Sequence, residues 1–240
     1  MEVFILAAGL GTRLKPITDT VPKALVEING IPLLEILLKR LSKYSPGNIV
    51  INIHHFGNQI IEFLESRDNF GLNITISDER SLLLDTGGGL KKATVLLKEE
   101  NFLIHNVDII SNLNLTSFMD YHTNSRCIAT LAVQKRNSSR YFLFDEKTML
   151  CGWENIKTGE KIITRNPQGA LNRYAFSGIH AGSRNLFALM PDKDIFSIVE
   201  FYLSIAKSHQ ITYFDHSETR FIDLGKIDNL AEAENIIKLL

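Results

Sequence analysis

The fold of this chain is decided by one stretch near its start, Phe4-Ile-Leu-Ala-Ala-Gly9-Leu-Gly11-Thr-Arg13-Leu-Lys15-Pro16, and by the Pro22-Lys23 that follows it. The apolar run over 3–8 is long enough for one buried strand. It leads into a loop whose glycines let the backbone approach a ligand closely and whose successive N–H groups attract anions. Arg13 adds a planar fork suited to phosphate, and Lys23 adds a compact point charge. This strand and loop therefore predict a nucleotide-phosphate site.

Two common glycine loops do not fit the stretch. A P-loop requires G-x-x-x-x-G-K-[ST], and the loop has no lysine after a glycine at that spacing. A dinucleotide fingerprint requires G-x-G-x-x-G, and Leu14 stands in the place of the third glycine, where a helix packs closely on the strand. The mismatch argues against a nicotinamide oxidoreductase, a class that the absence of NAD(P) binding would exclude.

The stretch from Ala8 to Pro16, together with Pro22-Lys23, resembles the signature loop of the sugar-1-phosphate nucleotidylyltransferases. All charged positions of the signature match, while Ala24 stands where the family commonly has a proline. The resemblance implies transfer of a nucleotidyl group from an NTP to a sugar 1-phosphate, which yields an NDP-sugar and pyrophosphate. It implies catalytic roles for Arg13 and Lys23, and it implies nucleotide contacts by Ala8, Gly9, Gly11, Thr12, Arg13 and Lys23.

A second glycine-rich stretch is Asp85-Thr86-Gly87-Gly88-Gly89-Leu90-Lys91-Lys92. Three glycines before a helix allow main-chain contact with a flat base or a phosphate, and the N-terminus of a helix favours anions. The family keeps a glycine-containing loop here that holds the nucleobase, so the resemblance implies nucleotide contacts by Asp85, Gly87 and Gly88. The T-G-G-G sequence is especially similar to the uridylyltransferases that act on N-acetylmuramate 1-phosphate, which usually have glutamate at the position of Asp85.

Two aspartates are expected at the carboxyl ends of strands, where open α/β sheets place their ligand sites. Asp108 follows the expected buried strand over 102–107, and Asp223 follows Phe221 and Ile222. Two converging carboxylates repel each other unless a divalent cation lies between them, and a small set of oxygen ligands suits Mg²⁺, which adds water and phosphate. Both residues resemble the family's paired metal aspartates. The resemblance therefore implies Mg²⁺ as the cofactor, with Asp108 and Asp223 as its ligands.

The sugar is expected to contact residues from both halves of the chain. The amide of Asn106 both donates and accepts hydrogen bonds, as a sugar hydroxyl or acetamido group requires. Glu154 falls in the region where relatives place a carboxylate on the sugar. Phe176-Ser177-Gly178 resembles a strand of the family whose small residues leave room for the sugar ring. The predicted sugar-binding residues are therefore Asn106, Glu154, Ser177 and Gly178.

Strands and helices alternate through the first half of the chain. Apolar patterns predict strands over 48–53, 72–77 and 101–105, and helices over 33–41, 58–65 and 89–97. Strands separated by short helices indicate a parallel sheet that helices cover. After Thr123 the pattern becomes more mixed, with strands expected over 127–134, 141–145, 149–153 and 175–181, and helices over 195–207 and 227–240.

The expected fold class is α/β, with a Rossmann-like three-layer α/β/α arrangement and a mixed, mainly parallel central sheet. This is the nucleotide-diphospho-sugar transferase type that the resemblance implies. We expect a single nucleotidyltransferase domain over 1–240, whose two halves share one sheet. Residues 1–123 are expected to form the nucleotide-binding half, and residues 124–240 the sugar-binding half, which carries Asp223 as the second metal ligand.

Charge and composition limit the partners that we expect. A formal net charge of −1 gives no electrostatic reason to expect binding to nucleic acid or to an acidic membrane. Met1 and Glu2 supply no basic leader, and the apolar run ends at Gly9, short of a signal or membrane segment. Cys127 and Cys151 are too far apart for a chelating C-x-x-C pair. We expect a cytoplasmic protein, a monomer or small homo-oligomer, with no nucleic-acid or membrane partner.

The expected reaction requires no catalytic base. A sugar 1-phosphate has a second pKa near ~6, so its attacking oxygen is mostly ionised at pH 7. What remains is to hold two anions together and to stabilise the charge that develops as pyrophosphate leaves. Arg13 is expected at the leaving β- and γ-phosphates, and Lys23 where the attacking phosphate meets the α-phosphate.

Residues leave the identity of the substrates open. T-G-G-G favours UTP with N-acetylmuramate 1-phosphate, and GTP with mannose 1-phosphate or heptose 1-phosphate is the alternative, because a carboxylate at Asp85 could accept both adjacent donors of guanine. A nucleotide-sugar-binding regulatory module without turnover is the non-enzyme alternative. Retention of Arg13, Lys23, Asp108 and Asp223 argues against that module, and an assay for released pyrophosphate distinguishes the two.

Overall fold

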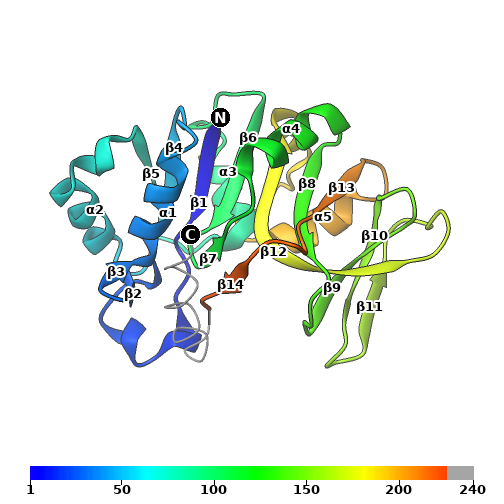
Figure 1. Cartoon of the computed structure of the whole chain (residues 1–240), viewed down its shortest axis with the longest axis horizontal. Coiled ribbons are helices and arrows are strands. Elements are labelled where there is room, and N and C mark those ends of the chain that lie inside the picture. The colour runs from blue at the N-terminus through cyan, green and yellow to red at the C-terminus, as the bar shows by residue number, and fades with distance from the viewer. Residues whose placement is uncertain (226–240) are drawn as a thin grey trace.

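In the computed structural model, which describes residues 1–225, strand β1 (Glu2–Leu6) runs through the middle of a wide sheet (Figure 1). β1 pairs in parallel with β4 (Ile49–Ile53) on one side and with β6 (Asn101–Asn106) on the other, and β5 (Ile74–Asp78) pairs in parallel with β4. The three central residues of β1 are fully buried, as in a parallel strand that helices cover on both faces. The strands predicted for the first half are confirmed.

The second half of the chain continues the same sheet. β12 (Asn172–Ser183) pairs antiparallel with β6, β8 (Ala129–Gln134) pairs antiparallel with β12, and β13 (Ile211–Asp215) pairs in parallel with β8. In the order β5-β4-β1-β6-β12-β8-β13, β12 is the strand that runs opposite to β1. The sheet is therefore mixed and mainly parallel, and both halves of the chain share it, as predicted.

An arm of antiparallel strands extends from the first part of β12. β9 (Arg140–Phe144) pairs with β12, and β10 (Leu150–Asn155) and β11 (Glu160–Ile163) follow in antiparallel order (Figure 1). The register of β12 against β8 shifts between Phe176 and His180. Within this bulge Gly178 has a φ of 69°, a conformation that glycine adopts without steric strain. The bulge places the middle of β12 beside the carboxyl end of β6.

Helices cover both faces of the central sheet. Two lie on one face, α3 (Asp85–Ala93) and α5 (Ile198–Ile205), and three lie on the other, α1 (Leu33–Ser42), α2 (Gly57–Ser66) and α4 (Leu115–Ser125). The apolar residues of each face form a separate buried cluster, and consecutive residues of β1 alternate between the two clusters. This alternation follows from the two-residue period of a strand. The predicted three-layer α/β/α arrangement is confirmed.

Helix α3 differs from the prediction, because it spans Asp85–Ala93 instead of 89–97 and so contains the three glycines. Glycine disfavours a helix by ~1 kcal/mol relative to alanine, which is why the helix was expected to start later. A Cβ on Gly87 would lie 2.8 Å from the carbonyl oxygen of Phe196, and a Cβ on Gly88 would lie 1.9 Å from that of Asp194. The bare glycine backbone lets α3 pack directly against this segment, so tertiary packing outweighs helix propensity.

Several short elements were not predicted. β7 (Ile109–Ser111) is one of them, and it pairs with β14 (Phe221–Asp223), the strand that was expected before Asp223. β2 (Glu27–Ile28) and β3 (Ile31–Pro32), which pair with each other, are two more. α4, β11 and β13 were also not predicted. Strands of two or three residues carry no readable alternation, and they exist because a partner strand is brought beside them.

The end of the described chain also differs from expectation. Helix α5 begins at Ile198 instead of 195, because Ser197 caps it and accepts a hydrogen bond from the Val199 N–H at 3.2 Å. Lys226 and the helix expected over 227–240 lie outside the described residues. Within residues 1–225, no helix combines the length and the apolar character that are needed to cross a membrane.

Buried histidines make the stability of this fold sensitive to acid. Burial lowers the pKa of His105 and of His180 to about 3, and that of His122 and of His216 to about 4. Since unfolded histidine titrates near ~6.5, the unfolded chain takes up protons below that pH that the folded chain does not. As the pH falls from roughly 6 to 4, each of these residues should therefore lower the free energy of unfolding by about 1.4 kcal/mol for every pH unit. Urea unfolding at successive pH values checks this, and a flat profile between pH 7 and pH 5 would contradict it.

Candidate functional site

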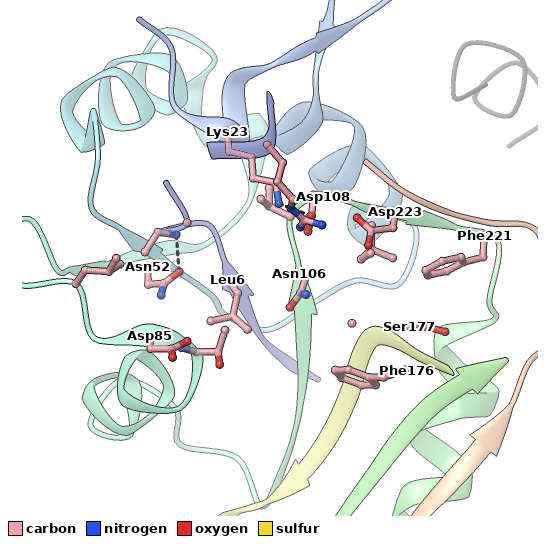
Figure 2. Close-up of a pocket in the computed structure, with 18 of the residues that line it drawn as sticks. Leu6, Lys23, Asn52, Asp85, Asn106, Asp108, Phe176, Ser177, Phe221 and Asp223 are labelled. Carbon is pink, nitrogen blue, oxygen red and sulfur yellow. Dashed lines mark hydrogen bonds and ion pairs between the residues drawn. The ribbon is translucent and has the colours of Figure 1, made fainter. Parts of the chain in front are cut away.

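A cavity of about 600 Å³ opens at the carboxyl ends of β1, β4 and β6. Open α/β sheets bind their ligands at this edge. Figure 2 shows Lys23, Asp108 and Asp223 gathered at one end of the cavity and Asp85 at another, with Asn106 between them. The cavity brings together most of the predicted site residues, namely Ala8, Gly9, Arg13, Lys23, Asp85, Asn106, Asp108, Ser177, Gly178 and Asp223.

Asn52, a polar residue on the buried strand β4, holds the start of the loop that follows β1. The N–H groups of Ala7 and Ala8 donate to Asn52 Oδ1 at 2.7 and 3.2 Å. Asn52 Nδ2 donates to Glu79 Oε1 at 2.8 Å, and Glu79 is fully buried. This burial raises the pKa of the Glu79 carboxyl. Because the amide is bonded on both sides, the loop leaves β1 in one fixed orientation.

Gly89 provides the space for this buried pair. A Cβ on Gly89 would lie 2.8 Å from both Asn52 Nδ2 and Glu79 Oε1. We expect Gly89→Ala to lower the free energy of unfolding by about 1–3 kcal/mol, as overpacking of a core does. Gly9→Ala is the matched control, because no atom of a residue other than its chain neighbours lies within 4 Å of a Cβ at Gly9. Urea denaturation measures both, and equal stability of the two variants would mean that the amide–carboxyl pair does not constrain α3.

Gly11 and Thr12 are not among the residues that line the cavity. Gly11 has a φ of 66°, and a Cβ on it would lie 2.8 Å from Thr18 Cγ2. The Thr18 hydroxyl donates to the Gly11 carbonyl oxygen at 2.9 Å. The turn itself therefore requires Gly11, and the nucleotide contacts expected of Gly11 and Thr12 stay predictions.

The two predicted catalytic cations approach the aspartates from this loop. Lys23 Nζ forms an ion pair with Asp108 Oδ2, and both side chains are largely buried. A Cβ on Gly225 would meet Arg13 Nη2 at 2.6 Å and Asp223 Oδ1 at 2.9 Å. The absent side chain of Gly225 thus leaves room for the arginine beside the aspartate. Lys23 thus contacts Asp108, while Arg13 and Asp223 both lie close to the backbone of Gly225.

The ladder of β7 and β14 brings the two aspartates together from distant parts of the chain. Asp223 lies opposite Ile109 in this antiparallel pair, and the Leu224 N–H donates to the carbonyl oxygen of Asp108 at 2.9 Å. Asp223 Oδ1 accepts a hydrogen bond from the Gly225 N–H at 2.8 Å. The backbone itself therefore sets the spacing of the two carboxylates.

The donor set at this end of the cavity fits Mg²⁺. Asp108 and Asp223 offer carboxylate oxygens, which hard cations prefer. Among residues 1–225, no group of three or more His, Cys, Asp or Glu side chains is arranged to hold a metal ion. Mg²⁺ needs few protein ligands because it keeps several waters and takes substrate phosphates, whereas a structural zinc site needs four nitrogen or sulfur ligands.

Asp85 lines the other end of the cavity at the start of α3. Its φ is 60°, and its Oδ1 accepts a hydrogen bond from the Thr86 N–H at 2.6 Å. Thr86 Oγ1 in turn accepts a hydrogen bond from the Ile198 N–H at 2.9 Å. These bonds tie the start of α3 to the start of α5 and hold the Asp85 carboxylate beside the cavity.

Gly87 and Gly88 do not line the cavity. Their N–H groups donate to the carbonyl oxygen of Phe196 at 2.9 and 3.2 Å. The structure therefore gives these two glycines a role in packing α3 against the segment before α5. Their direct contact with a nucleotide stays a prediction.

The side of the cavity that was predicted to face the sugar is built on the bulge of β12. A Cβ on Gly178 would lie 2.8 Å from Asn106 Nδ2, so the glycine leaves room for that amide. The Ser177 hydroxyl is bonded to His216 Nε2 at 2.8 Å, and His216 Nδ1 is bonded to Thr219 Oγ1 at 2.7 Å. Figure 2 shows the Ser177 oxygen directed away from Asn106. Ser177 therefore contributes mainly backbone to the cavity wall.

Glu154 is not among the residues that line the cavity. It lies on β10, where it is buried and forms an ion pair with Arg173. Its contact with a sugar stays a prediction, and the structure gives the carboxylate a partner on β12.

Other residues that line the cavity were not placed in the site by the sequence analysis, namely Leu6, Asn52, Leu83, Val107, Ile109, Ile195 and Phe221. Asn52 could have been recognised from the sequence, because an amide inside an apolar strand must find hydrogen-bond partners once it is buried. The apolar residues could not have been recognised, since apolar residues that line a cavity look the same in the sequence as those of the core.

The sequence of this chain is similar to those of known nucleotidyltransferases. A family profile described as nucleotidyl transferase matches residues 2–145. The N-acetylmuramate alpha-1-phosphate uridylyltransferase of Caulobacter vibrioides is 45% identical over 108 residues, which are 44% of this chain and 45% of that protein. The D-glycero-alpha-D-manno-heptose 1-phosphate guanylyltransferase of Aneurinibacillus thermoaerophilus is 25% identical over 98% of this chain and 97% of that protein.

A solved structure supports the same fold. HddC from Yersinia pseudotuberculosis, complexed with GMP-PN, matches with a TM-score of 0.78 and 20% identity, covering 98% of each chain. The chain spans about half the length of the Caulobacter relative. The family profile covers more than half of this chain and includes the loop after β1, α3 and Asp108. On this evidence the chain belongs to the nucleotidyl transferase family.

Proposed function

We propose that this protein transfers a nucleotidyl group from an NTP to a sugar 1-phosphate, with release of pyrophosphate, and that UTP and N-acetylmuramate 1-phosphate are its substrates. The observation that carries the proposal is the meeting of Arg13, Lys23, Asp108 and Asp223 in one cavity at the carboxyl edge of the sheet. Two cations beside two carboxylates suit a metal-assisted transfer between phosphates. The similarity to the uridylyltransferase of Caulobacter vibrioides supports the choice of substrates.

The chemistry needs positioning more than proton transfer. The phosphate of the sugar is already mostly ionised at pH 7, so its oxygen can attack the α-phosphorus without a base. Lys23 carries three N–H donors, and it can keep one on Asp108 while it offers another to a phosphate oxygen. Arg13 presents a planar fork to the leaving phosphates. Asp108 holds the charge of Lys23 in place before the substrates bind, which is the arrangement that stabilises developing charge most effectively.

Asp108 and Asp223 are the residues that would hold Mg²⁺. When bound, the metal supplies charge stabilisation to phosphate oxygens. The remaining contacts assigned to the nucleotide are the backbone of Ala8 and Gly9 and the side chain of Asp85, all of which line the cavity. Asn106 and the backbone of Ser177 and Gly178 form the wall assigned to the sugar.

We propose a single domain over 1–240, with a nucleotide-binding half over 1–123 that also contributes Asn106 to the sugar, and a sugar-binding half over 124–240 that also contributes Asp223 to the metal. The continuous sheet through β6 and β12 supports one domain, because a strand from each half forms part of the same hydrogen-bonded ladder. We place the protein in the cytoplasm, as a monomer or small homo-oligomer.

The nucleotide preference gives the first test. We expect UTP to be preferred over GTP by at least ~10-fold in kcat/KM, which corresponds to ~1.4 kcal/mol. A matrix of NTPs and sugar 1-phosphates with Mg²⁺, scored by released pyrophosphate, measures it. A preference for GTP would transfer the assignment to mannose 1-phosphate or heptose 1-phosphate. Two observations support this second candidate function, the use of GTP. Asp85 lies in the cavity wall, and the chain is similar to the heptose 1-phosphate guanylyltransferase of Aneurinibacillus thermoaerophilus.

A nucleotide-sugar-binding regulatory module is the alternative outside the enzymes. The same matrix decides, because such a module binds an NDP-sugar yet releases no pyrophosphate with any combination of substrates. The presence of both cations and both carboxylates in one cavity supports the enzyme.

A further inference from the structure

A second cavity, of about 520 Å³, lies at the base of the arm formed by β9 and β10. Its lining is strongly cationic, since it contains Lys135, Arg136 and Arg173 and no aspartate or glutamate. Arg173 is ion-paired with Glu154, whereas Lys135 and Arg136 form no ion pair with a carboxylate of residues 1–225. An anionic group in this cavity would therefore meet an excess of positive charge.

Arg136 lines the second cavity and packs against two residues of the first. Arg136 Nη2 donates to the carbonyl oxygen of Phe176 at 2.8 Å, and the guanidinium carbon lies 4.6 Å from the ring centre of Phe221. Phe176 and Phe221 both line the first cavity, on the side assigned to the sugar (Figure 2). Arg136 therefore lies directly behind two residues that face a sugar in that cavity, while it also lines the second cavity.

The guanidinium of Arg136 has donors to spare. An arginine carries five N–H donors in a planar fork, and one hydrogen bond of this side chain is accounted for by Phe176. Arg136 Nε is buried and has no hydrogen-bond partner among the described residues. Burial lowers the pKa of Arg136, an effect that the nearby negative charge of Asp223 opposes. A cation held in this way gains from an acceptor that a ligand brings, and a planar carboxylate matches the fork in two parallel hydrogen bonds.

We propose that Arg136 binds a carboxylate carried by the sugar of the substrate, and that the second cavity receives the substituent that bears this carboxylate. The inference rests on the proposed function and deepens it, because it defines the sugar as an acidic one and names the residue that selects it. The phosphate at the anomeric carbon belongs beside Lys23 and Asp108, so we assign a second anionic group on the same sugar to Arg136.

Two sugar 1-phosphates that differ by one acidic substituent provide the test. N-acetylmuramate 1-phosphate is N-acetylglucosamine 1-phosphate with a lactyl ether that carries a carboxylate. The wild-type protein should use the acidic sugar with a kcat/KM at least ~10-fold higher than the neutral one. Arg136→Gln should remove most of this preference by raising KM for the acidic sugar, while kcat/KM for the neutral sugar changes by less than ~3-fold.

Two further variants separate binding of the carboxylate from support of the fold. Arg136→Lys keeps the charge without the planar fork, so it should retain part of the preference. Arg140→Gln removes an exposed arginine at the start of β9 that lines neither cavity, and it should leave both substrates unaffected. Thermal unfolding of each variant shows whether it is folded.

Three results would overturn the inference. An equal loss for both sugars in Arg136→Gln would make Arg136 a support for Phe176 and Phe221. A wild-type protein that uses the neutral sugar as well as the acidic one would remove the selection itself. Both results leave the proposed function intact, whereas a protein that releases no pyrophosphate with any NTP and sugar 1-phosphate would reject the function and the inference together.

Discussion

Lys23→Ala is expected to lower kcat for nucleotidyl transfer by on the order of 10²-fold or more. The ammonium of Lys23 lies at the end of the cavity where the two aspartates meet, and it is largely buried there. Charge on the phosphates rises as pyrophosphate leaves, so the lysine stabilises the transition state more than the bound substrates. A continuous assay of pyrophosphate release with saturating UTP and sugar 1-phosphate measures the loss.

The same substitution removes the partner of a buried carboxylate. Because Lys23 forms an ion pair with Asp108, the alanine variant should also lose some stability, and its thermal unfolding must be measured beside its activity. Lys15→Ala is the matched control, since Lys15 belongs to the same loop but is exposed and pairs with Asp19 at 2.9 Å. A folded Lys23→Ala variant with near-normal turnover would show that the phosphates do not contact this lysine.

Asp223→Asn is expected to raise the Mg²⁺ concentration needed for half-maximal activity and to reduce kcat by on the order of 10²-fold. The amide keeps the size of the side chain and one oxygen acceptor, while it removes the negative charge that a hard cation requires. Asp108→Asn should act in the same direction, with an added effect from the loss of its ion pair with Lys23. Titration of activity with Mg²⁺ measures both variants.

Chelation provides the complementary measurement on the unaltered protein. Excess EDTA should abolish activity, and Mg²⁺ should restore it. Asp19→Asn, in an exposed ion pair of the loop, is the matched control and should keep the Mg²⁺ dependence of the wild type. Activity that persists in excess EDTA would remove the metal from the mechanism and leave Asp108 and Asp223 with a structural role.

Local patterns were sufficient to predict the framework of this fold. β1, β4 and β6 are apolar runs bounded by polar or glycine-containing segments, and α1 repeats leucine at the spacing of one helix face. The expected strands and helices of the first half, the mixed sheet and its three layers follow from such patterns because burial of each element depends on its own residues. The phosphate-binding character of the loop after β1 was also readable, since glycine freedom and cationic charge are local properties.

Long-range contacts decided where the elements begin and how the site is closed. The start of α3 depends on Gly87 and Gly88 packing against the backbone of Asp194 and Phe196, which no helix-propensity argument contains. The role of Asn52 depends on Glu79 and on the N–H groups of Ala7 and Ala8. Glu154 on β10 forms an ion pair with Arg173 on β12, so its place in the sequence did not reveal its surroundings.

By itself, the sequence determined the parallel framework around β1, the chemistry of its loop and the types of side chain available for phosphate and metal. The tertiary structure alone decided that Asp223 lies beside Asp108, that Arg13 reaches over Gly225, and that Arg136 stands behind Phe176 and Phe221. The physical reason is that secondary structure and charge follow from neighbours along the chain, whereas the pairing of β7 with β14 and the bulge of β12 depend on surfaces that exist only after the sheet has formed.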